Sequence, residues 1–175
     1  MNIFVVDADP FVAAQNLCDA HVVKMIVESC QLLSTQDRIN GLYGELRYKE
    51  THIKHPCRKC LDNRYNYTWL CYHLGALLAE YTYRYGKTHK CGQVFQLYWE
   101  LPGIKEYTKY PNAWLCDFCE DLRYLTLPQC MPEQFKNENL SIDRTVEAYR
   151  KYYRYKRDNL KRFKYTKREP PEWLD

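Results

Sequence analysis

Glycine is scarce in this chain, with six residues in 175, and no apolar stretch is long. A β-sandwich of this size needs more turn glycines, so the low count favours a helical protein. A membrane-spanning helix needs about eighteen consecutive apolar residues, and no such run occurs. The apolar start MNIFVV is too short for a signal peptide and lacks a basic segment. We therefore expect a cytoplasmic protein without membrane contact.

Several motifs of common enzymes are also missing from the sequence. The chain contains no glycine-rich phosphate loop, no Gly-x-Ser-x-Gly elbow, no HExxH zinc motif and no EF-hand loop. Internal repeats and low-complexity tracts are absent as well. A length of 175 residues suits one domain with its own hydrophobic core, and the oligomeric state is left open.

Basic and aromatic residues are concentrated near the C-terminus. Residues 149–168 read YRKYYRYKRDNLKRFKYTKR, with ten Lys or Arg and six aromatics against one acid. This block has a net charge of +9 while the whole chain has +4, so the remainder sums to −5. Positive charge interleaved with flat rings suits nucleic acid, and DNA is the expected partner. A solvated, salt-bridged helix face is the alternative. The predicted contacts are Arg150, Lys151, Arg154, Lys156 and Arg157.

The pattern of apolar residues predicts a mainly α fold, a compact single-domain helical bundle over residues 1–175. A short N-terminal strand or arm should occupy residues 2–6, and a first helix should begin at Asp9-Pro10 and extend to about residue 34. A second long helix should be capped by Asp62 or Asn63 and end at Gly86. The last helix, residues 144–168, should carry the basic aromatic block.

Both long helices place polar residues beside an apolar stripe. His21, Lys24 and Glu28 fall within about 60° on the first helix, and Glu80 and Arg84 share a band on the second. A lysine beside a carboxylate can supply an amine nucleophile and an acid–base group for chemistry at a sugar C1′. A plain surface Lys–Glu pair explains the spacing equally well. We predict a cleft between the two helices whose catalytic residues are His21, Lys24, Glu28, His55 and Glu80.

A turn rich in basic residues follows the second helix, with the sequence RYGKTHK. A glycine-hinged turn with several donors is typical of a phosphate clamp. Cations near a helix C-terminus also interact favourably with the helix dipole, which is the plainer interpretation. The residues of the predicted clamp are Arg84, Lys87, His89 and Lys90.

Nine cysteines leave at least one unpaired in any disulfide scheme, and most should be free thiols in a reducing compartment. The pairs Cys57/Cys60 and Cys116/Cys119 have the spacing of zinc knuckles. His55, Cys91 and Cys130 are further ligands in such a scheme. The two pairs are too far apart in sequence for a compact zinc finger. We therefore predict no metal and no other cofactor, with a structural zinc as the less favoured alternative.

Four segments in fixed order carry a resemblance to a known family. They are LCDAHVVKMIVES (17–29), KHPCRKC (54–60), NYTWL (66–70) and EYTYRYGKTHK (80–90). These segments are similar to small phage and viral proteins and, more distantly, to bacterial pyrimidine-dimer DNA glycosylases. The resemblance covers roughly the first ninety residues, and Cys60 stands where the phage-type pattern has a tryptophan. The positions that correspond are Lys24, Glu28, His55, Pro56, Glu80 and Arg84.

The resemblance implies a DNA-repair hydrolase, a base-excision glycosylase for damaged or modified pyrimidines with an accompanying lyase step. A phage- or virus-encoded protein would act in the host cytoplasm. Well-studied dimer glycosylases use the α-amine exposed after methionine removal, whereas a Met1-Asn2 start usually keeps its methionine. Lys24, or a water activated by Glu28, is then the expected nucleophile.

Three alternatives to a glycosylase remain open from the sequence. The first is a non-enzymatic nucleic-acid-binding protein with a structural zinc, and the second is an accessory factor that binds protein. The third is a metal-dependent helical enzyme, although it lacks the Glu-x-x-His pair typical of such sites. Its ligands would be drawn from His21, Glu28, His55, His73 and Glu80.

Overall fold

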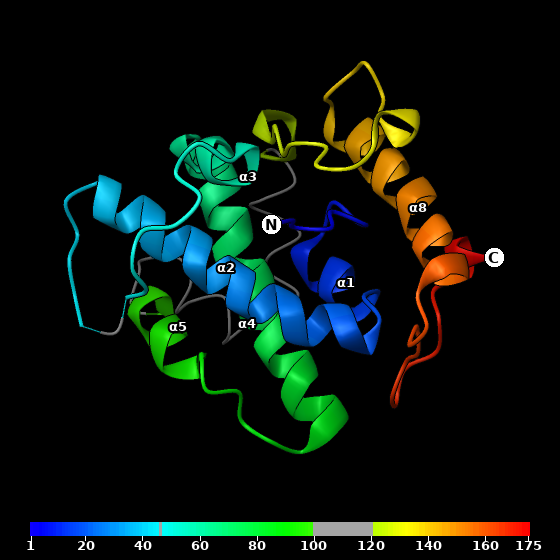
Figure 1. Ribbon diagram of the computed structural model, residues 1–175, viewed down its shortest axis with the longest axis horizontal. Helices are drawn as coiled ribbons and strands as arrows, with labels where there is room; N and C mark the ends of the chain where they lie inside the picture. Colours follow the sequence, from blue (N-terminus) through cyan, green and yellow to red (C-terminus); the bar gives the residue numbers. More distant parts are fainter. Residues whose placement is uncertain (46, 100–120) are drawn as a thin grey trace.

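The computed structural model describes residues 1–45, 47–99 and 121–175 (Figure 1). These residues are mainly helical and contain no β-strand, which confirms the predicted fold class. Residues 2–6 form an extended arm and not a strand. None of the described helices is long and apolar enough to cross a membrane. The helices are α1 (Pro10–Gln15), α2 (Asp19–Ile39), α3 (Pro56–Lys59), α4 (Arg64–Tyr85), α5 (Gly92–Trp99) and α8 (Ile142–Asn159), with 3₁₀ turns at Cys60–Asp62, Asp121–Tyr124, Glu133–Phe135 and Glu172–Leu174.

The first predicted helix is in fact two helices. The Asp9 carboxylate caps α1 by accepting hydrogen bonds from the backbone N–H groups of the first turn, as the sequence indicates. A break follows because the N–H of Cys18 donates to the Tyr153 hydroxyl at 2.8 Å and not to the preceding helical turn. The chain resumes its helical path at Asp19. This break turns α2 away from α1.

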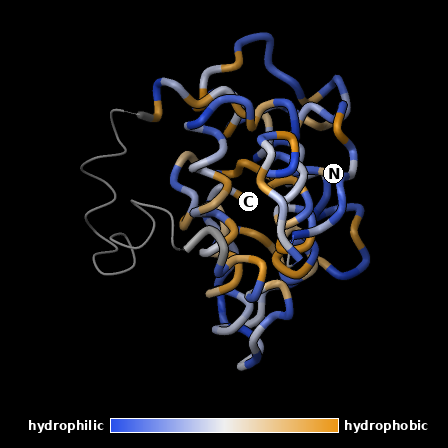
Figure 2. The backbone as a smooth tube through the Cα atoms, turned by 90° about the vertical axis from the view of Figure 1, so that its left-hand side faces the viewer, coloured by the Kyte–Doolittle hydropathy of each residue, from blue (hydrophilic) through white to orange (hydrophobic). Residues whose placement is uncertain are grey.

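Both predicted ends of α4 are confirmed. The Asn63 side chain accepts a hydrogen bond from the N–H of Tyr65 at 2.9 Å and so caps the helix. Gly86 ends it with φ +65°, a left-handed conformation that suits glycine. α4 packs along both α1 and α2, and Trp69 and Leu70 are completely buried there. Most hydrophilic segments lie on the outside of the molecule (Figure 2).

The N-terminal arm lies between α2 and α8. Phe4 is buried with φ +54°, and its ring stacks on His21 of α2 at 4.3 Å between centroids. The same ring meets the edges of Tyr149 and Tyr153 of α8. The Asn2 side-chain oxygen accepts hydrogen bonds from the next two backbone N–H groups. These contacts fix the position of the first residues.

The last helix ends earlier than predicted. α8 stops at Asn159, and residues 160–168 follow as a non-helical segment. This segment returns to the start of α2, where the N–H of Asp19 donates to the carbonyl of Lys164 at 2.9 Å. The Asp19 carboxylate accepts two further hydrogen bonds from Thr166. Attachment to Asp19 therefore replaces the continuation of the helix.

Candidate active site

Glu28 lies beside the start of the chain. Its Oε2 accepts a hydrogen bond from the backbone nitrogen of Asn2 at 2.8 Å. The Asn2 side-chain amide in turn donates to the carbonyl of Cys130 at 2.7 Å. The arm and the residue-130 segment thus hold the Asn2 nitrogen against a carboxylate of α2. Neither contact can be inferred from local sequence, because the partners are 26 and 128 residues apart.

Lys24 is a cationic neighbour of Glu28. Its Nζ lies 3.4 Å from Oε1 of Glu28, which confirms the expected i, i+4 pair. The lysine side chain is 64% exposed and the glutamate side chain only 14%. Glu28 is therefore a largely covered carboxylate with a solvent-facing cation on one side and the arm on the other.

His55 lines a pocket together with Met1 at the start of the chain. It caps α3, and its Nδ1 accepts a hydrogen bond from the N–H of Cys57 at 3.1 Å. Partial burial, the positive N-terminal amine and His52 lower the pKa of His55, and Glu28 acts in the opposite direction. His55, Glu28 and the start of the chain therefore share one electrostatic environment. The pocket has a volume of about 470 Å³ and is lined by Met1, His55, Pro56, Pro128, Gln129, Cys130, Met131, Pro132, Lys136 and Tyr152.

His21 lies behind the site and not in it. Its Nδ1 is 2.8 Å from the Tyr153 hydroxyl, and its ring supports Phe4 of the arm. Burial, followed by the charges of Lys156 and Lys24, lowers the pKa of His21 to about 3. The ring is therefore neutral at physiological pH, and its contacts position the arm.

Glu80 and Arg84 are placed in a separate, buried network. Arg84 donates to Glu80 at 3.0 Å, to Asp19 at 3.1 Å and to two backbone carbonyls that precede α2. Glu80 also accepts two hydrogen bonds from Arg168. Burial opposes ionisation of Asp19, but hydrogen bonds from Thr166 and Arg84 outweigh it and lower the pKa of Asp19.

The structure therefore does not bring all the predicted catalytic residues into one cleft. Asp19 anchors the Arg84 network and lies nine residues before Glu28, a distance of about 13 Å along α2. Glu28 pairs with Lys24 beside the arm, and Glu28 acts on His55 only electrostatically. Glu80 and Arg84 meet at the C-terminal segment. His21 belongs to the packing between the arm and α8.

The predicted phosphate clamp lies at the far end of α4. This helix has 22 residues and extends for about 33 Å, from Arg64 after the 3₁₀ turn at Cys60–Asp62 to the turn at Gly86 (Figure 1). Lys87 and Lys90 are exposed on that turn, while Arg84 is buried. His89 packs edge-on against Tyr81, and its Nδ1 accepts a hydrogen bond from the N–H of Cys91. Only the two lysines are thus available for a surface contact.

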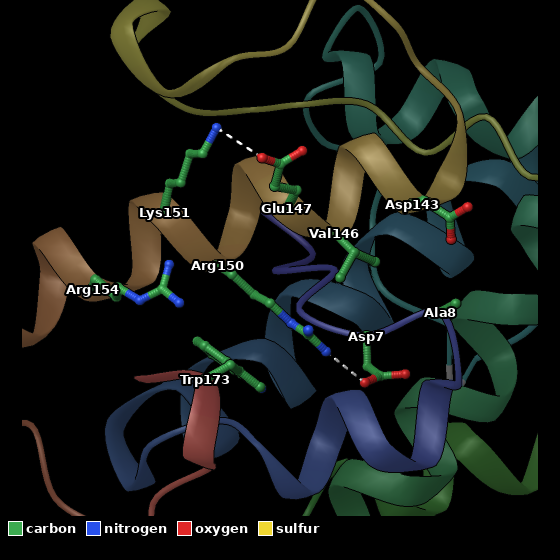
Figure 3. A pocket seen from close by; sticks show the side chains of 9 residues that line it. All are labelled: Asp7, Ala8, Asp143, Val146, Glu147, Arg150, Lys151, Arg154 and Trp173. Carbon is green, nitrogen blue, oxygen red and sulfur yellow. Dashed lines mark hydrogen bonds and ion pairs between the residues drawn. The ribbon is translucent and has the colours of Figure 1, made fainter. Parts of the chain in front are cut away.

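The basic residues of α8 are largely paired with other parts of the protein. Arg150 donates to the carbonyl of Val6 and to Asp7, and its guanidinium lies over the Trp173 ring (Figure 3). Lys151 forms an ion pair with Glu147 at 3.0 Å. Arg150 therefore holds the arm and the C-terminal turn onto α8. The other three predicted DNA-contacting residues have different surroundings. Arg154 points into the pocket of Figure 3, and Lys156 lies over the rings of Phe4 and Tyr152. Arg157 forms an ion pair with Asp158.

The pocket in Figure 3 is larger than the one beside His55, at about 550 Å³. Its lining includes three acidic and three basic side chains, so its charge does not favour a phosphate chain. Its acidic residues are Asp7, Asp143 and Glu147, and its basic residues are Arg150, Lys151 and Arg154. We therefore place the candidate site at the smaller pocket, whose lining residues Met1 and Cys130 adjoin the contact between Asn2 and Glu28.

The contacts of Cys57 and Cys60 differ from those of the zinc knuckle that their spacing suggests. Cys57 faces Cys130, with 3.3 Å between the sulfur atoms, and Cys60 instead donates to the carbonyl of Cys57. Cys116 and Cys119 lie outside the described residues. The approach of Cys130 to Cys57 had no signal in the sequence, because 73 residues separate them.

The chain belongs to the pyrimidine dimer DNA glycosylase family, whose sequence profile matches residues 1–93. That range contains the arm, Glu28 and the whole of α3 and α4. It excludes Cys130 and α8, which complete the pocket and hold the arm. No curated protein and no solved structure matches the chain.

Proposed function

We propose that the protein is a DNA glycosylase that removes a damaged or modified pyrimidine and then cleaves the abasic sugar by a lyase step. One observation carries the proposal: the Asn2 nitrogen lies 2.8 Å from Oε2 of Glu28. The proposal requires removal of Met1, although a Met1-Asn2 start usually keeps its methionine, and this nitrogen is then a primary amine held against a carboxylate. An amine and an acid–base group in contact are what substitution at a sugar C1′ requires.

The nucleophile is thus assigned to the Asn2 nitrogen and not to Lys24, which the sequence alone favoured. The lone pair of the amine forms a bond to C1′ while the bond from C1′ to the base breaks. The base leaves with that electron pair and takes a proton from solvent. Ionised Glu28 accepts the proton that the attacking amine loses.

The lyase step uses the same two groups. Opening of the sugar ring gives an iminium ion between C1′ and the Asn2 nitrogen, and Glu28 returns its proton to the ring oxygen. Glu28 then removes a proton from C2′, and the 3′ phosphate leaves by β-elimination. Hydrolysis of the iminium ion releases the Asn2 amine, and the steps balance without a metal or a redox cofactor.

The pocket lined by Met1 and Cys130 provides a place for an extruded base. Its volume of about 470 Å³ lies in the range typical of small-molecule sites. Tyr152 offers an aromatic ring in its lining, and enzymes that act on a base take it out of the helical stack. Met1 also lines this pocket, so its removal would both enlarge the pocket and expose the amine.

Lysines around the pocket supply positive charge for the DNA backbone. Lys24 lies beside Glu28, and Lys136 belongs to the pocket lining. The Nζ of Lys156 is 4.9 Å from the centroid of Tyr152, another lining residue. Phosphate contacts of this kind give affinity and orientation without sequence preference.

Borohydride trapping on an oligonucleotide with an abasic site tests the nucleophile. Digestion and mass spectrometry of the trapped protein should place the sugar on the α-nitrogen of Asn2. A sugar on Lys24 would assign the lyase step to that amine, and the absence of any adduct would contradict the lyase step altogether.

Glycosylase activity is tested on oligonucleotides that carry ultraviolet-induced pyrimidine dimers or single oxidised pyrimidines. Glu28→Gln keeps the shape of the side chain and removes the base, so base release should fall by about 10²–10⁴-fold. Glu147→Gln is the matched control, because Glu147 also pairs with a lysine four residues away but lies on α8. Unchanged base release in Glu28→Gln would contradict the proposal. Binding to DNA without base release by the unaltered protein would favour a non-enzymatic binding protein.

A further inference from the structure

Three side chains of metal-binding types converge at the wall of the pocket. One ligand atom from each of His55, Cys57 and Cys130 lies within 4.8 Å of the other two. The sulfur atoms of Cys57 and Cys130 are 3.3 Å apart. The group joins the start of α3 to a segment that follows it by more than seventy residues. The tertiary fold, and not the spacing in the sequence, brings these three side chains together.

The backbone holds these residues in place before any ligand binds. The N–H of Cys130 donates to the Tyr149 hydroxyl at 3.2 Å, and its carbonyl accepts from the Asn2 side chain. His55 and Cys57 lie at the N-terminus of α3, whose backbone fixes their separation. Ligands on such fixed elements lose little freedom on binding a metal.

We propose that His55, Cys57 and Cys130 bind a zinc ion whose fourth coordination position opens toward the pocket. Bond lengths of about 2.3 Å to sulfur and 2.0 Å to nitrogen place the two sulfurs of a tetrahedral site roughly 3.8 Å apart and each sulfur roughly 3.5 Å from the nitrogen. The present group needs only small side-chain shifts to reach that geometry. Two thiolates and an imidazole select zinc over calcium or magnesium, which take oxygen ligands.

The histidine already presents the required form of its ring. Nδ1 of His55 accepts a hydrogen bond from the amide of Cys57, so the lone pair of the neutral ring is on that atom. A zinc ion bound at Nδ1 replaces this hydrogen bond with a coordinate bond. The two thiols release their protons to solvent when they bind, and their negative charges balance the dication.

The ligand set differs from the one that the Cys-x-x-Cys spacing suggests. The Cys60 thiol donates to the carbonyl of Cys57 at 3.2 Å and is absent from the converging group. His55 and Cys130 both line the pocket, so the fourth position is reached by water. Three protein ligands and one open position are typical of exchangeable or catalytic zinc sites.

Metal titration of the reduced full-length protein tests the site without DNA. After removal of metal with a chelator, zinc is added in competition with a chromophoric chelator, and cobalt is used as a spectroscopic probe. We expect one zinc ion per chain, and cobalt spectra with thiolate charge-transfer bands and the strong visible absorption of tetrahedral coordination. Zinc should also protect Cys130 from alkylation, as measured by peptide mass spectrometry.

Variants distinguish the proposed ligand set from the sequence pattern. Cys130→Ser and His55→Gln should each weaken zinc binding by more than about 100-fold, since even changes behind a ligand cost about 10–100-fold. Cys60→Ser should bind zinc like the unaltered chain. Loss of zinc in Cys60→Ser, retention in Cys130→Ser or no uptake by the reduced protein would each overturn the proposal. Because no readout uses DNA, failure here leaves the proposed glycosylase activity unaffected, and the reverse also holds.

Discussion

Two acid–cation pairs, Lys24–Glu28 on α2 and Glu80–Arg84 on α4, share the i, i+4 spacing and end up in opposite environments. The first pair lies beside the N-terminal arm, and its lysine is 64% exposed. In the second pair the arginine side chain has no exposed surface and the glutamate has 6%. The same local pattern therefore produces a candidate catalytic carboxylate in one place and a structural clamp in the other.

The third partner of each pair accounts for the difference. Glu28 meets the Asn2 nitrogen, a group that becomes reactive once it is a free amine. Glu80 meets Arg168, whose guanidinium completes its hydrogen bonds and encloses it. Buried charges need such complete pairing, while a carboxylate that moves protons needs a site that substrate can reach. Sequence spacing specifies the pairs, and distant segments decide their roles.

Arg84→Met is expected to have the largest effect on stability. It removes the cation between two buried carboxylates, Glu80 and Asp19, and should lower the free energy of unfolding by about 3–5 kcal/mol. Chemical denaturation measures the loss, and Lys87→Met, an exposed residue just beyond the same helix, is the control. Base release per folded molecule should not change. A folded but inactive Arg84→Met would return Arg84 to the DNA-binding cleft.

Acid should lower the stability of the folded protein because two histidines are buried. Burial lowers the pKa of His21 to about 3 and of His73 to about 4, against 6.5 for an exposed ring. Between these values the unfolded chain binds protons that the folded chain does not, so stability falls as pH falls below about 6.5. Each histidine contributes up to about 1.4 kcal/mol per pH unit, or about 3–4 kcal/mol for both between pH 7 and 5.

Chemical denaturation of His73→Gln at pH 7 and at pH 5 measures how much His73 contributes to this loss of stability. Glutamine can keep the hydrogen bond that His73 donates to the carbonyl of Pro10, and it does not titrate. The loss of stability between the two pH values should shrink by about 2 kcal/mol relative to the unaltered chain. An unchanged loss would mean that His73 is charged, or already exposed, in the folded protein.

Features fixed by neighbouring residues were predictable from the sequence. The caps of α4 depend on Asn63 and Gly86 themselves, and both ends were predicted correctly. The break before α2 was missed, because it depends on a hydrogen bond from Cys18 to Tyr153, 135 residues away. The end of α8 was missed for the same reason, since Asp19 binds the segment that follows it.

The candidate site likewise contains residues that local sequence indicates and residues that only the tertiary fold brings there. Glu28 and Lys24 stand out because helical spacing pairs them, and His55 stands out through its His-Pro turn. The Asn2 nitrogen reaches the site on the arm, and Cys130 lies on a segment 128 residues later in the chain, so no local pattern predicts that they come together. Helical periodicity gives a direction around one helix, whereas convergence of segments depends on the tertiary fold.

Lys24→Met should have the smallest effect and sharpens the assignment of the nucleophile. The pair with Glu28 is solvent-exposed on the lysine side, so stability should change by less than about 1 kcal/mol. Loss of one phosphate contact should reduce the slope of log affinity against log salt by about 1, and Lys24→Arg should restore it. Base release should fall roughly fivefold, and the borohydride adduct should still form on Asn2. If Lys24→Met abolishes the adduct while DNA binding persists, then Lys24 is the attacking amine and the contact between Asn2 and Glu28 only anchors the arm.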